Sequence, residues 1–352
     1  MPSEMSQANG SEARLLSDER FLRKVAYMYY EDGNSQEIIA EKEFCSRQTV
    51  SKALQKAKDR GIVRVSIVPD MRSGYLRNLS REARIGLELE DVVLVPGNNF
   101  EGMKEHETAE EVVVEIAKSA ADYLDQLLTN TDILAVSGGT TFMRNVARYL
   151  NPNRLLPHLQ VVATIGFVEA HTSDGDANLI AYDIARAYGG MHTWCCMPAF
   201  FPTIPNALMS ITMMRQMDPI MKQAASLHDR ANVVMMSIWP PHTNDEVVVR
   251  GILSKEQIQT VEAMHPAVDI NHWVFNAEGR CINTLLDPPP YYLTGFEIPH
   301  LKRKIRKEGA KVILVAGGGP AYISAIRATL KAGLANILIT DHVTAQLLLT
   351  EK

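Results

Sequence analysis

The chain has 352 residues, of which 46% are hydrophobic and 22% charged, and its formal net charge is −5. This length and composition exclude a chain without a packed core and leave room for a small domain plus a large one. Four cysteines form no CxxC pair and no Cys/His cluster, so neither a disulfide framework nor a metal site is expected. The sequence also has no run of about 18 apolar residues and no apolar leader, which predicts a cytoplasmic protein without a membrane partner.

The N-terminal region predicts short helices behind a disordered tail at residues 1–15. Apolar residues recur at helical spacing from Phe21 to Tyr30, and this pattern ends near a glycine. Ser35 then predicts the N-cap of a short second helix. In that helix we expect three residues to pack inward, namely Ile38, Ile39 and Ala40.

A third helix is predicted after Ser46, a second N-cap, and it coincides with the most basic part of the chain. The segment from Phe44 to Arg64 has a net charge of +5, so the remaining residues sum to −10. Val50, Ala53, Leu54 and Ala57 form the expected buried stripe, and the opposite face is polar and basic.

Such a face can donate hydrogen bonds to base edges from the first turns of a helix in a DNA major groove, with lysines near phosphates farther along. A solvated helical hairpin with a charged face is the alternative interpretation. The residues predicted to bind DNA are Ser35, Gln36, Ser46, Arg47, Gln48, Thr49, Ser51, Lys52 and Lys56. The alternating segment 61–68, "GIVRVSIV", predicts a wing strand, which closes a helix-turn-helix domain at residues 16–69.

Residues 70–352 alternate between short apolar strands and amphipathic helices. Continuous apolar strands separated by helices predict a Rossmann-like α/β fold with a parallel sheet covered on both faces. In such a sheet the ligand site lies beyond the carboxyl ends of the strands.

Three segments at predicted strand ends could bind a ligand. Gly138 and Gly139 precede Thr140 and Thr141 at a strand-to-helix turn, which can present backbone N–H groups and hydroxyls to an anion. A second turn repeats this arrangement at residues 317–319, and Asp341 ends a further strand. Each glycine turn can equally be only a tight turn, and Asp341 can equally be only an N-cap.

Residues 25–67 resemble the amino-terminal helix-turn-helix of the SorC/DeoR-type sugar-responsive regulators, in "SQEIIA", "SRQTVSKAL" and "GIVRV". The likeness continues over most of residues 76–350, through "SGGTTFMRNVA", "AGG" and "LITDHVTA". The resemblance implies a sugar-isomerase-like effector domain, with the effector's anionic end at residues 138–141 and its hydroxyls on Asp269. It also implies a homodimer or homotetramer.

Two departures from the family pattern bear on function. Phe44 stands where the family has a glycine in the helix-turn-helix turn, so we expect either a rebuilt turn or a packing role for this ring. Ala321 or Tyr322 stands where the family has a lysine that meets phosphate. This substitution predicts an effector without a phosphate, unless Arg144 or Arg186 compensates.

The sequence thus predicts a transcriptional regulator that binds double-stranded operator DNA under the control of a small carbohydrate-like effector, with no cofactor. The predicted effector residues are Gly138, Gly139, Thr140, Thr141, Asp269, Gly317, Gly318, Tyr322 and Asp341. The alternative is a sugar-phosphate isomerase- or deaminase-like enzyme with an accessory DNA-binding domain. Its candidate acid/base residues, Glu169, His171, His265, Asp269 and His272, form no recognisable catalytic motif, so no catalytic residue is assigned.

Overall fold

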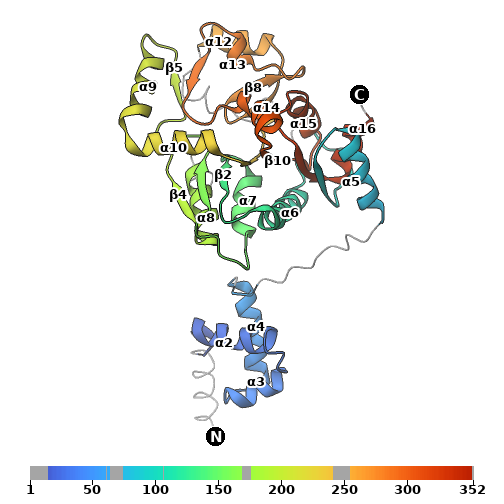
Figure 1. Cartoon of the computed structure of the whole chain (residues 1–352). Helices are drawn as coiled ribbons and strands as arrows, with labels where there is room; N and C mark the ends of the chain where they lie inside the picture. The colour runs from blue at the N-terminus through green and yellow to red at the C-terminus, as the bar shows by residue number, and fades with distance from the viewer. Residues whose placement is uncertain are drawn as a thin grey trace. The chain divides into compact units, whose positions relative to one another are not determined.

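A computed structural model describes residues 15–60, 62–63, 74–105, 107–168, 176–240 and 254–350. The chain divides into two compact units, Met1–Met71 and Arg72–Lys352 (Figure 1). The predicted wing lies mostly outside the described residues, as does the predicted tail up to residue 14. Leu15, the last residue assigned to that tail, packs against the core of the small unit.

The small unit is built from α2 (Glu19–Tyr30), α3 (Gln36–Lys42) and α4 (Arg47–Asp59). The caps predicted for the last two helices are confirmed, because the Ser35 and Ser46 hydroxyls accept from backbone N–H groups three residues on. The predicted stripe of α4 is fully or almost fully buried against α2 and α3. These contacts form a helical core, and the basic residues of α4 lie on its outer surface.

Two expectations for this unit are wrong. Ile38 does not pack inward, because 43% of it is exposed, whereas Ile39 and Ala40 are buried. Phe44 neither rebuilds the turn nor packs into it. The residue keeps a positive φ of 52° and its side chain is 97% exposed, which is an unfavourable conformation for phenylalanine.

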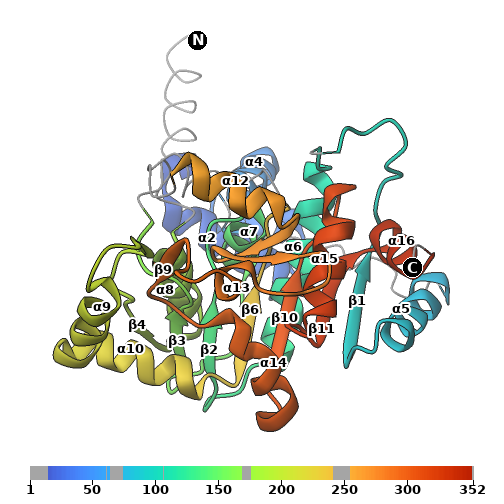
Figure 2. The same cartoon turned by 90° about the horizontal axis from the view of Figure 1, so that it is seen from above.

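The large unit contains the predicted parallel sheet, which confirms the α/β fold class. Within the described residues seven strands pair in the order β1-β11-β10-β6-β2-β3-β4, every pair parallel (Figure 2). The strands are β1 (Asp91–Val95), β2 (Ile133–Val136), β3 (Gln160–Ala163), β4 (Met191–Thr193), β6 (Val233–Met236), β10 (Lys311–Val315) and β11 (Ile337–Asp341).

Helices cover both faces of this sheet, as its apolar strands require. One face carries α6 (Glu110–Leu127), α7 (Thr141–Tyr149) and α8 (Ala177–Tyr188), and the other carries α5 (Gly74–Gly86), α10 (Pro219–Arg230), α15 (Ala321–Lys331) and α16 (His342–Thr350). The remaining helices are α9 (Ala207–Met217), α12 (Lys255–Ala263), α13 (Ile282–Leu285), η2 (Ile298–His300), α14 (Leu301–Arg303) and η3 (Lys304–Glu308).

Two small antiparallel ribbons were not predicted. One pairs β5 (Phe200–Pro202) with β9 (Tyr291–Leu293), and the other pairs β7 (Pro266–Ile270) with β8 (Trp273–Asn276). The β7–β8 ribbon is tied to the main sheet, because the backbone of Asp269 exchanges two hydrogen bonds with that of Trp239. This connection brings a segment of the ribbon to the carboxyl end of β6.

The direction in which successive strands extend the sheet reverses between β2 and β6. After β2 the sheet grows through β3 and β4, whereas β6, β10 and β11 extend it the other way. Two neighbouring strands whose connections leave in opposite directions form a topological switch point, where ligands of open α/β sheets bind. The turn at residues 138–141 and the segment 237–239 therefore lie at the expected ligand position.

Candidate DNA-binding face and effector site

The exposed face of α4 presents the polar residues predicted to meet DNA. Arg47, Gln48, Ser51 and Lys52 are all exposed, and they lie opposite the buried stripe. Gln55 extends this face by one turn, where its side chain donates to Asp59 at 2.9 Å. The spacing alone could have identified Gln55, since it follows Ser51 by four residues.

Not every residue predicted on this face has a side chain there. Thr49 is 4% exposed, and its hydroxyl lies 2.8 Å from that of Ser46, so both support the helix cap. Ser35 likewise caps α3. The Thr49 and Ser35 side chains therefore have partners in the helix caps, and their contact with DNA stays a prediction.

Two ion pairs join helices of the small unit. The guanidinium of Arg47 lies 2.9 Å from the carboxylate of Glu37, and Lys24 lies 2.7 Å from Glu43. The backbone N–H of Glu37, the Ser35 hydroxyl and the Arg47 guanidinium together lower the pKa of the Glu37 carboxyl. Both partners of the first pair are exposed, so DNA phosphates and bases can compete for Arg47 at little cost.

The switch point of the large unit gathers residues from three segments. Gly139 is exposed with a φ of +83°, and a Cβ added there would lie 3.5 Å from the indole ring of Trp239. The backbone pairing of Trp239 with Asp269 brings the predicted acidic residue to the same place. Trp239 thus lies against the predicted turn with its indole ring and pairs with the predicted acidic residue through its backbone.

The turn after β2 divides into buried and exposed residues. Gly138 is required by close packing, because its Cβ would lie 2.6 Å from Ala177. Thr140 is buried and caps α7 by accepting from the Met143 N–H at 3.2 Å. Gly139 and Thr141 remain exposed, and they are the residues of this turn that can touch a ligand directly.

Asp269 is held in place by the turn between β7 and β8. Its Oδ1 accepts from the His272 N–H at 2.6 Å, and its side chain is 16% exposed. The turn residues Asn271 and His272 both have positive φ, 52° and 64°, where a glycine is usual. Hydrogen bonds from Asn271 to Thr164 and from Tyr291 to the His272 carbonyl hold this unfavourable turn.

The second glycine turn is closed. The N–H of Gly318 donates to the Asp341 carboxylate at 2.7 Å, and a Cβ on Gly319 would lie 2.3 Å from the Glu107 carbonyl oxygen. Asp341 is fully buried and also accepts from the N–H and hydroxyl of Thr344, so it caps α16. Gly317, Gly318 and Asp341 thus have structural partners, and their predicted contact with an effector does not fit this geometry.

Tyr322 occupies the start of α15, where the family pattern has its lysine. Its ring is 8% exposed and packs edge-on against Phe142 of α7, with centroids 5.6 Å apart. Burial raises the pKa of its phenol to about 12, so the group is neutral at pH 7.

Arg186 cannot replace the lysine, because it lies in the last turn of α8, far from the carboxyl ends of the strands, and pairs with Asp183. Arg144, in the first turn of α7, follows the open turn directly.

Sequence reasoning missed two residues near this site, Ser237 and Trp239. Ser237 is 3% exposed, and its hydroxyl has no hydrogen-bond partner within the described part of the chain. Ser237 follows β6 next to Ser137, whose hydroxyl accepts from its N–H. Trp239, two residues on, covers the open turn. Their place after a predicted strand was the available signal.

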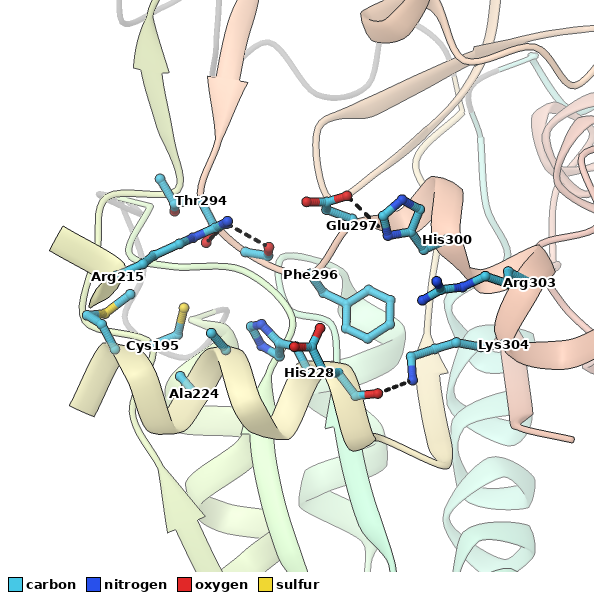
Figure 3. A pocket seen from close by; sticks show the side chains of 14 residues that line it. Cys195, Arg215, Ala224, His228, Thr294, Phe296, Glu297, His300, Arg303 and Lys304 are labelled. Atoms are coloured by element: carbon cyan, nitrogen blue, oxygen red, sulfur yellow. Dashed lines mark hydrogen bonds and ion pairs between the residues drawn. The ribbon is translucent and has the colours of Figure 1, made fainter. Parts of the chain in front are cut away.

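A cavity of about 200 Å³ lies elsewhere, between α10 and residues 294–304 (Figure 3). No residue predicted for the effector site lines it. Its buried polar groups bind the protein itself: Lys304 donates to the Asp229 carbonyl oxygen at 2.6 Å, and His228 bonds the Ala163 carbonyl. Burial lowers the pKa of His228 to about 4, so the ring is neutral at pH 7. We assign no ligand to this cavity.

Of the candidate acid/base residues, Asp269 and His272 lie together, with 3.7 Å between the Asp269 Oδ2 and the His272 Nδ1. Glu169 and His171 lie outside the described residues. His265 is exposed before the first residue of β7, whereas His272 is buried in the turn after it. Over the described ranges, no helix is long and apolar enough to span a membrane, and no group of three or more acidic, His or Cys side chains could hold a metal ion.

Comparison with known proteins agrees with this architecture. The family model of the "Putative sugar-binding domain" matches residues 76–350. The deoxyribonucleoside regulator of Bacillus subtilis is 25% identical over 328 residues, covering 93% of this chain and 96% of that protein. The sorbitol operon regulator of Klebsiella pneumoniae is 25% identical over 335 residues, covering 94% and 98%.

Solved structures show the same fold. The full-length sorbitol operon regulator SorC of Klebsiella pneumoniae superimposes with a TM-score of 0.67 at 24% identity, covering 95% of this chain and all of that one. A probable sor operon regulator from Shigella flexneri covers 78% of this chain with a TM-score of 0.63 and 21% identity. Because the domain model spans most of the chain, this protein belongs to the SorC/DeoR-type family of sugar-binding transcriptional regulators.

Proposed function

We propose that this protein is a one-component transcriptional regulator in which a small carbohydrate-like effector controls binding to operator DNA. The observation that carries the proposal is the presence of two different units in one chain. The small unit presents a capped recognition-type helix with a polar, basic face, and the large unit has an open turn at the switch point of a parallel sheet. The effector shifts the population of DNA-competent molecules by binding one state better than the other.

The DNA-binding part of the proposal rests on α4. Its first turns can place Arg47 and Gln48 against base edges, because both side chains are exposed at the N-terminal end. Lys56 lies more than two turns farther on and suits a phosphate contact. The helix thus separates residues that read sequence from residues that add affinity.

The effector part of the proposal favours hydroxyl groups over phosphate. Asp269 can accept hydrogen bonds from sugar hydroxyls with its exposed edge, and the Ser237 hydroxyl, two residues before Trp239, has no partner within the described residues. The indole of Trp239 offers an apolar surface for a sugar ring. The lysine that would meet a phosphate is replaced by a neutral, buried Tyr322, so phosphate loses a charge-assisted contact. We infer a neutral sugar or polyol as effector.

Within the described residues the enzyme alternative rests on one pair, Asp269 and His272, whose Oδ2 and Nδ1 atoms lie 3.7 Å apart. Asp269 also accepts the His272 N–H and so braces the turn, and His265 lies at the other end of β7. The relatives compared above are named as regulators. Turnover of any ligand that binds would favour the alternative, so each ligand found should be re-isolated and checked for chemical change.

A ligand screen tests the effector. The purified chain is melted with pooled sugars, polyols and sugar phosphates, and the thermal shifts are ranked. A selective ligand at 100 Kd should add about 2.7 kcal/mol of stability. We expect neutral sugars or polyols to give the largest shift, whereas a sugar phosphate at the top, with affinity falling steeply as salt rises, contradicts the hydroxyl assignment.

Operator selection from fragmented genomic DNA tests the DNA part. With the selected site, Gln48→Ala should weaken specific binding more than random binding, whereas Lys56→Ala should weaken both alike and reduce the salt slope by about one unit. Equal losses on both DNAs for both variants would remove the recognition role from α4.

A further inference from the structure

Residues 300–311 form a second strongly basic segment, which neither the DNA-binding face of α4 nor the effector site uses. In "HLKRKIRKEGAK" six lysines and arginines stand against one glutamate, so the segment has a net charge of +5. The segment 44–64 of the small unit has the same net charge, and the rest of the chain therefore sums to −15. A cluster of positive charge in an otherwise acidic chain is typical of a surface that binds a polyanion.

The fold holds this segment in place and turns most of its charges outward. The segment includes α14 and η3, and η3 is a π-helical turn, a rare form that is frequent at functional sites. Leu301 and Lys304 are buried, and the Lys304 ammonium donates to the Asp229 carbonyl oxygen at 2.6 Å (Figure 3). Figure 2 shows α14 at the lower edge of the large unit. Four side chains are exposed there and are here called the basic patch: Lys302, Arg303, Arg306 and Lys307.

Acidic side chains neutralise little of the basic patch. Glu308 pairs with the buried Lys304 at 3.0 Å and lies 3.9 Å from Arg303, so one carboxylate is shared between two cations. Glu297, before the segment, pairs with His300 at 3.1 Å. The other three members of the patch have no hydrogen-bond or ion-pair partner in the part of the chain that the structure describes, namely Lys302, Arg306 and Lys307.

The elements next to the basic patch do not cancel its charge. The stem of Lys302 lies over Gly333, and the exposed Lys331, two residues before that glycine, adds a further cation at the end of α15. At the end of α10 the exposed Asp229 and Arg230 have opposite charges, so this helix end adds no net charge.

We propose that the basic patch binds the phosphate backbone of DNA that flanks the operator. The proposal rests on the proposed function, in which the small unit holds the chain on DNA. Residues 61–73 connect α4 to α5, and a chain of 13 residues spans at most about 45 Å, so the large unit stays close to the bound duplex.

Duplex DNA suits the basic patch better than a small anion does. DNA carries one negative charge per about 1.7 Å of its axis, so several cations spread over a surface can each meet a phosphate. A small anion in the cavity beside α14 would touch only Arg303 of the four, because the other three do not line it. Backbone contacts of this kind add affinity and salt dependence but no sequence preference.

Fluorescence anisotropy with the full chain and two lengths of duplex tests the proposal. The short duplex ends at the selected operator, and the long one adds about 30 bp of random sequence on each side, about 100 Å at 3.4 Å per base pair. We expect the wild type to bind the long duplex at least about tenfold more tightly in 0.1 M salt, with a salt slope steeper by about three units, since each phosphate contact contributes about 0.9.

The patch variant carries Lys302→Gln, Arg306→Gln and Lys307→Gln. It should keep the affinity of the wild type for the short duplex and lose most of the gain from the flanks. A dispersed control removes the same charge from exposed lysines on three separate helices, through Lys118→Gln, Lys222→Gln and Lys255→Gln, and should behave like the wild type. Thermal melting checks that both variants fold, which the exposure of the changed residues favours.

Hydroxyl-radical footprinting locates the contact on the long duplex. The wild type and the dispersed control should protect the flanks, and the patch variant should protect the operator alone. Equal losses in both variants would reveal an effect of overall charge and overturn the proposal. Flanks that give the wild type neither affinity nor protection would also overturn it and would point to an acidic protein as the partner of the patch. A wild type that binds neither duplex would overturn the regulator function itself, and this proposal with it.

Discussion

The two glycine turns of the large unit have the same sequence logic and opposite structural roles. Each follows a strand and precedes a helix, at residues 138–139 and 317–319. In the first, Gly139 is exposed beside an indole, whereas in the second all three glycines are buried. Close contacts explain the difference, since the second turn packs on the loop before α6 and on Asp341.

This comparison teaches that glycine at a strand end has two separate uses. It can let a ligand approach the backbone, or it can let another part of the protein do so. The number of glycines does not decide between them, because the neighbouring side chains fill the space or leave it open. The two uses predict different losses when a methyl group is added.

The largest effect is expected at the closed turn. Gly319→Ala places a Cβ 2.3 Å from the Glu107 carbonyl oxygen, so the backbone must shift, and we expect a loss of about 3–5 kcal/mol in the free energy of unfolding. Urea denaturation measures it. Gly74→Ala is the control, because a Cβ there meets nothing within 4 Å, and it should be nearly neutral. Equal stability of the two variants would mean that the closed turn is not closely packed.

A smaller loss is expected from the carboxylate that closes this turn. Asp341→Ala removes the cap of α16 and leaves the Gly318 N–H unpaired, which should cost about 2–3 kcal/mol. Asp176→Ala removes a cap of α8 that binds only its own helix, and should cost about 1 kcal/mol. Thermal melts of both proteins give the difference. Equal losses would show that Asp341 is a cap and nothing more.

The open site should lose affinity rather than stability. Asp269→Asn should weaken binding of the best ligand from the screen by about 1.5–3 kcal/mol, because the hydrogen bonds there are charge-assisted. Thr141→Ala removes a neutral hydroxyl and should cost about 0.5–1.5 kcal/mol. Calorimetry compares them. The reverse order would move recognition from the hydroxyl-binding acid to the anion-binding turn.

At the open turn itself, only a small loss of stability is expected, for Gly139→Ala. Its Cβ would make ordinary contact with Trp239 at 3.5 Å, and the remaining cost is the positive φ, about 1 kcal/mol. The variant should fold but bind the selected ligand at least tenfold more weakly. Undiminished ligand affinity in a folded Gly139→Ala protein would place the effector away from this turn.

Much of the difference between the two turns cannot be predicted from the sequence. The apolar strands and the capping serines could be predicted, because periodicity and N-cap chemistry are local. The closing of the second turn could not, since it depends on Glu107 and Asp341, which are distant in sequence. Trp239 was missed for the same reason, because its contact with Gly139 joins two strands. The exposure of Phe44 at a positive φ was not predicted either, because burial of its ring depends on the packing of other helices.

The central claim is that a ligand beside Trp239 controls DNA binding. It is tested most directly in a protein with Trp194→Phe and Trp273→Phe, where Trp239 is the sole tryptophan of the sequence. The selected ligand is titrated while Trp239 emission and the anisotropy of labelled operator DNA are recorded together. We predict that both change with the same midpoint. DNA release with unchanged Trp239 emission, or an emission change that leaves DNA affinity unaltered, would contradict the account.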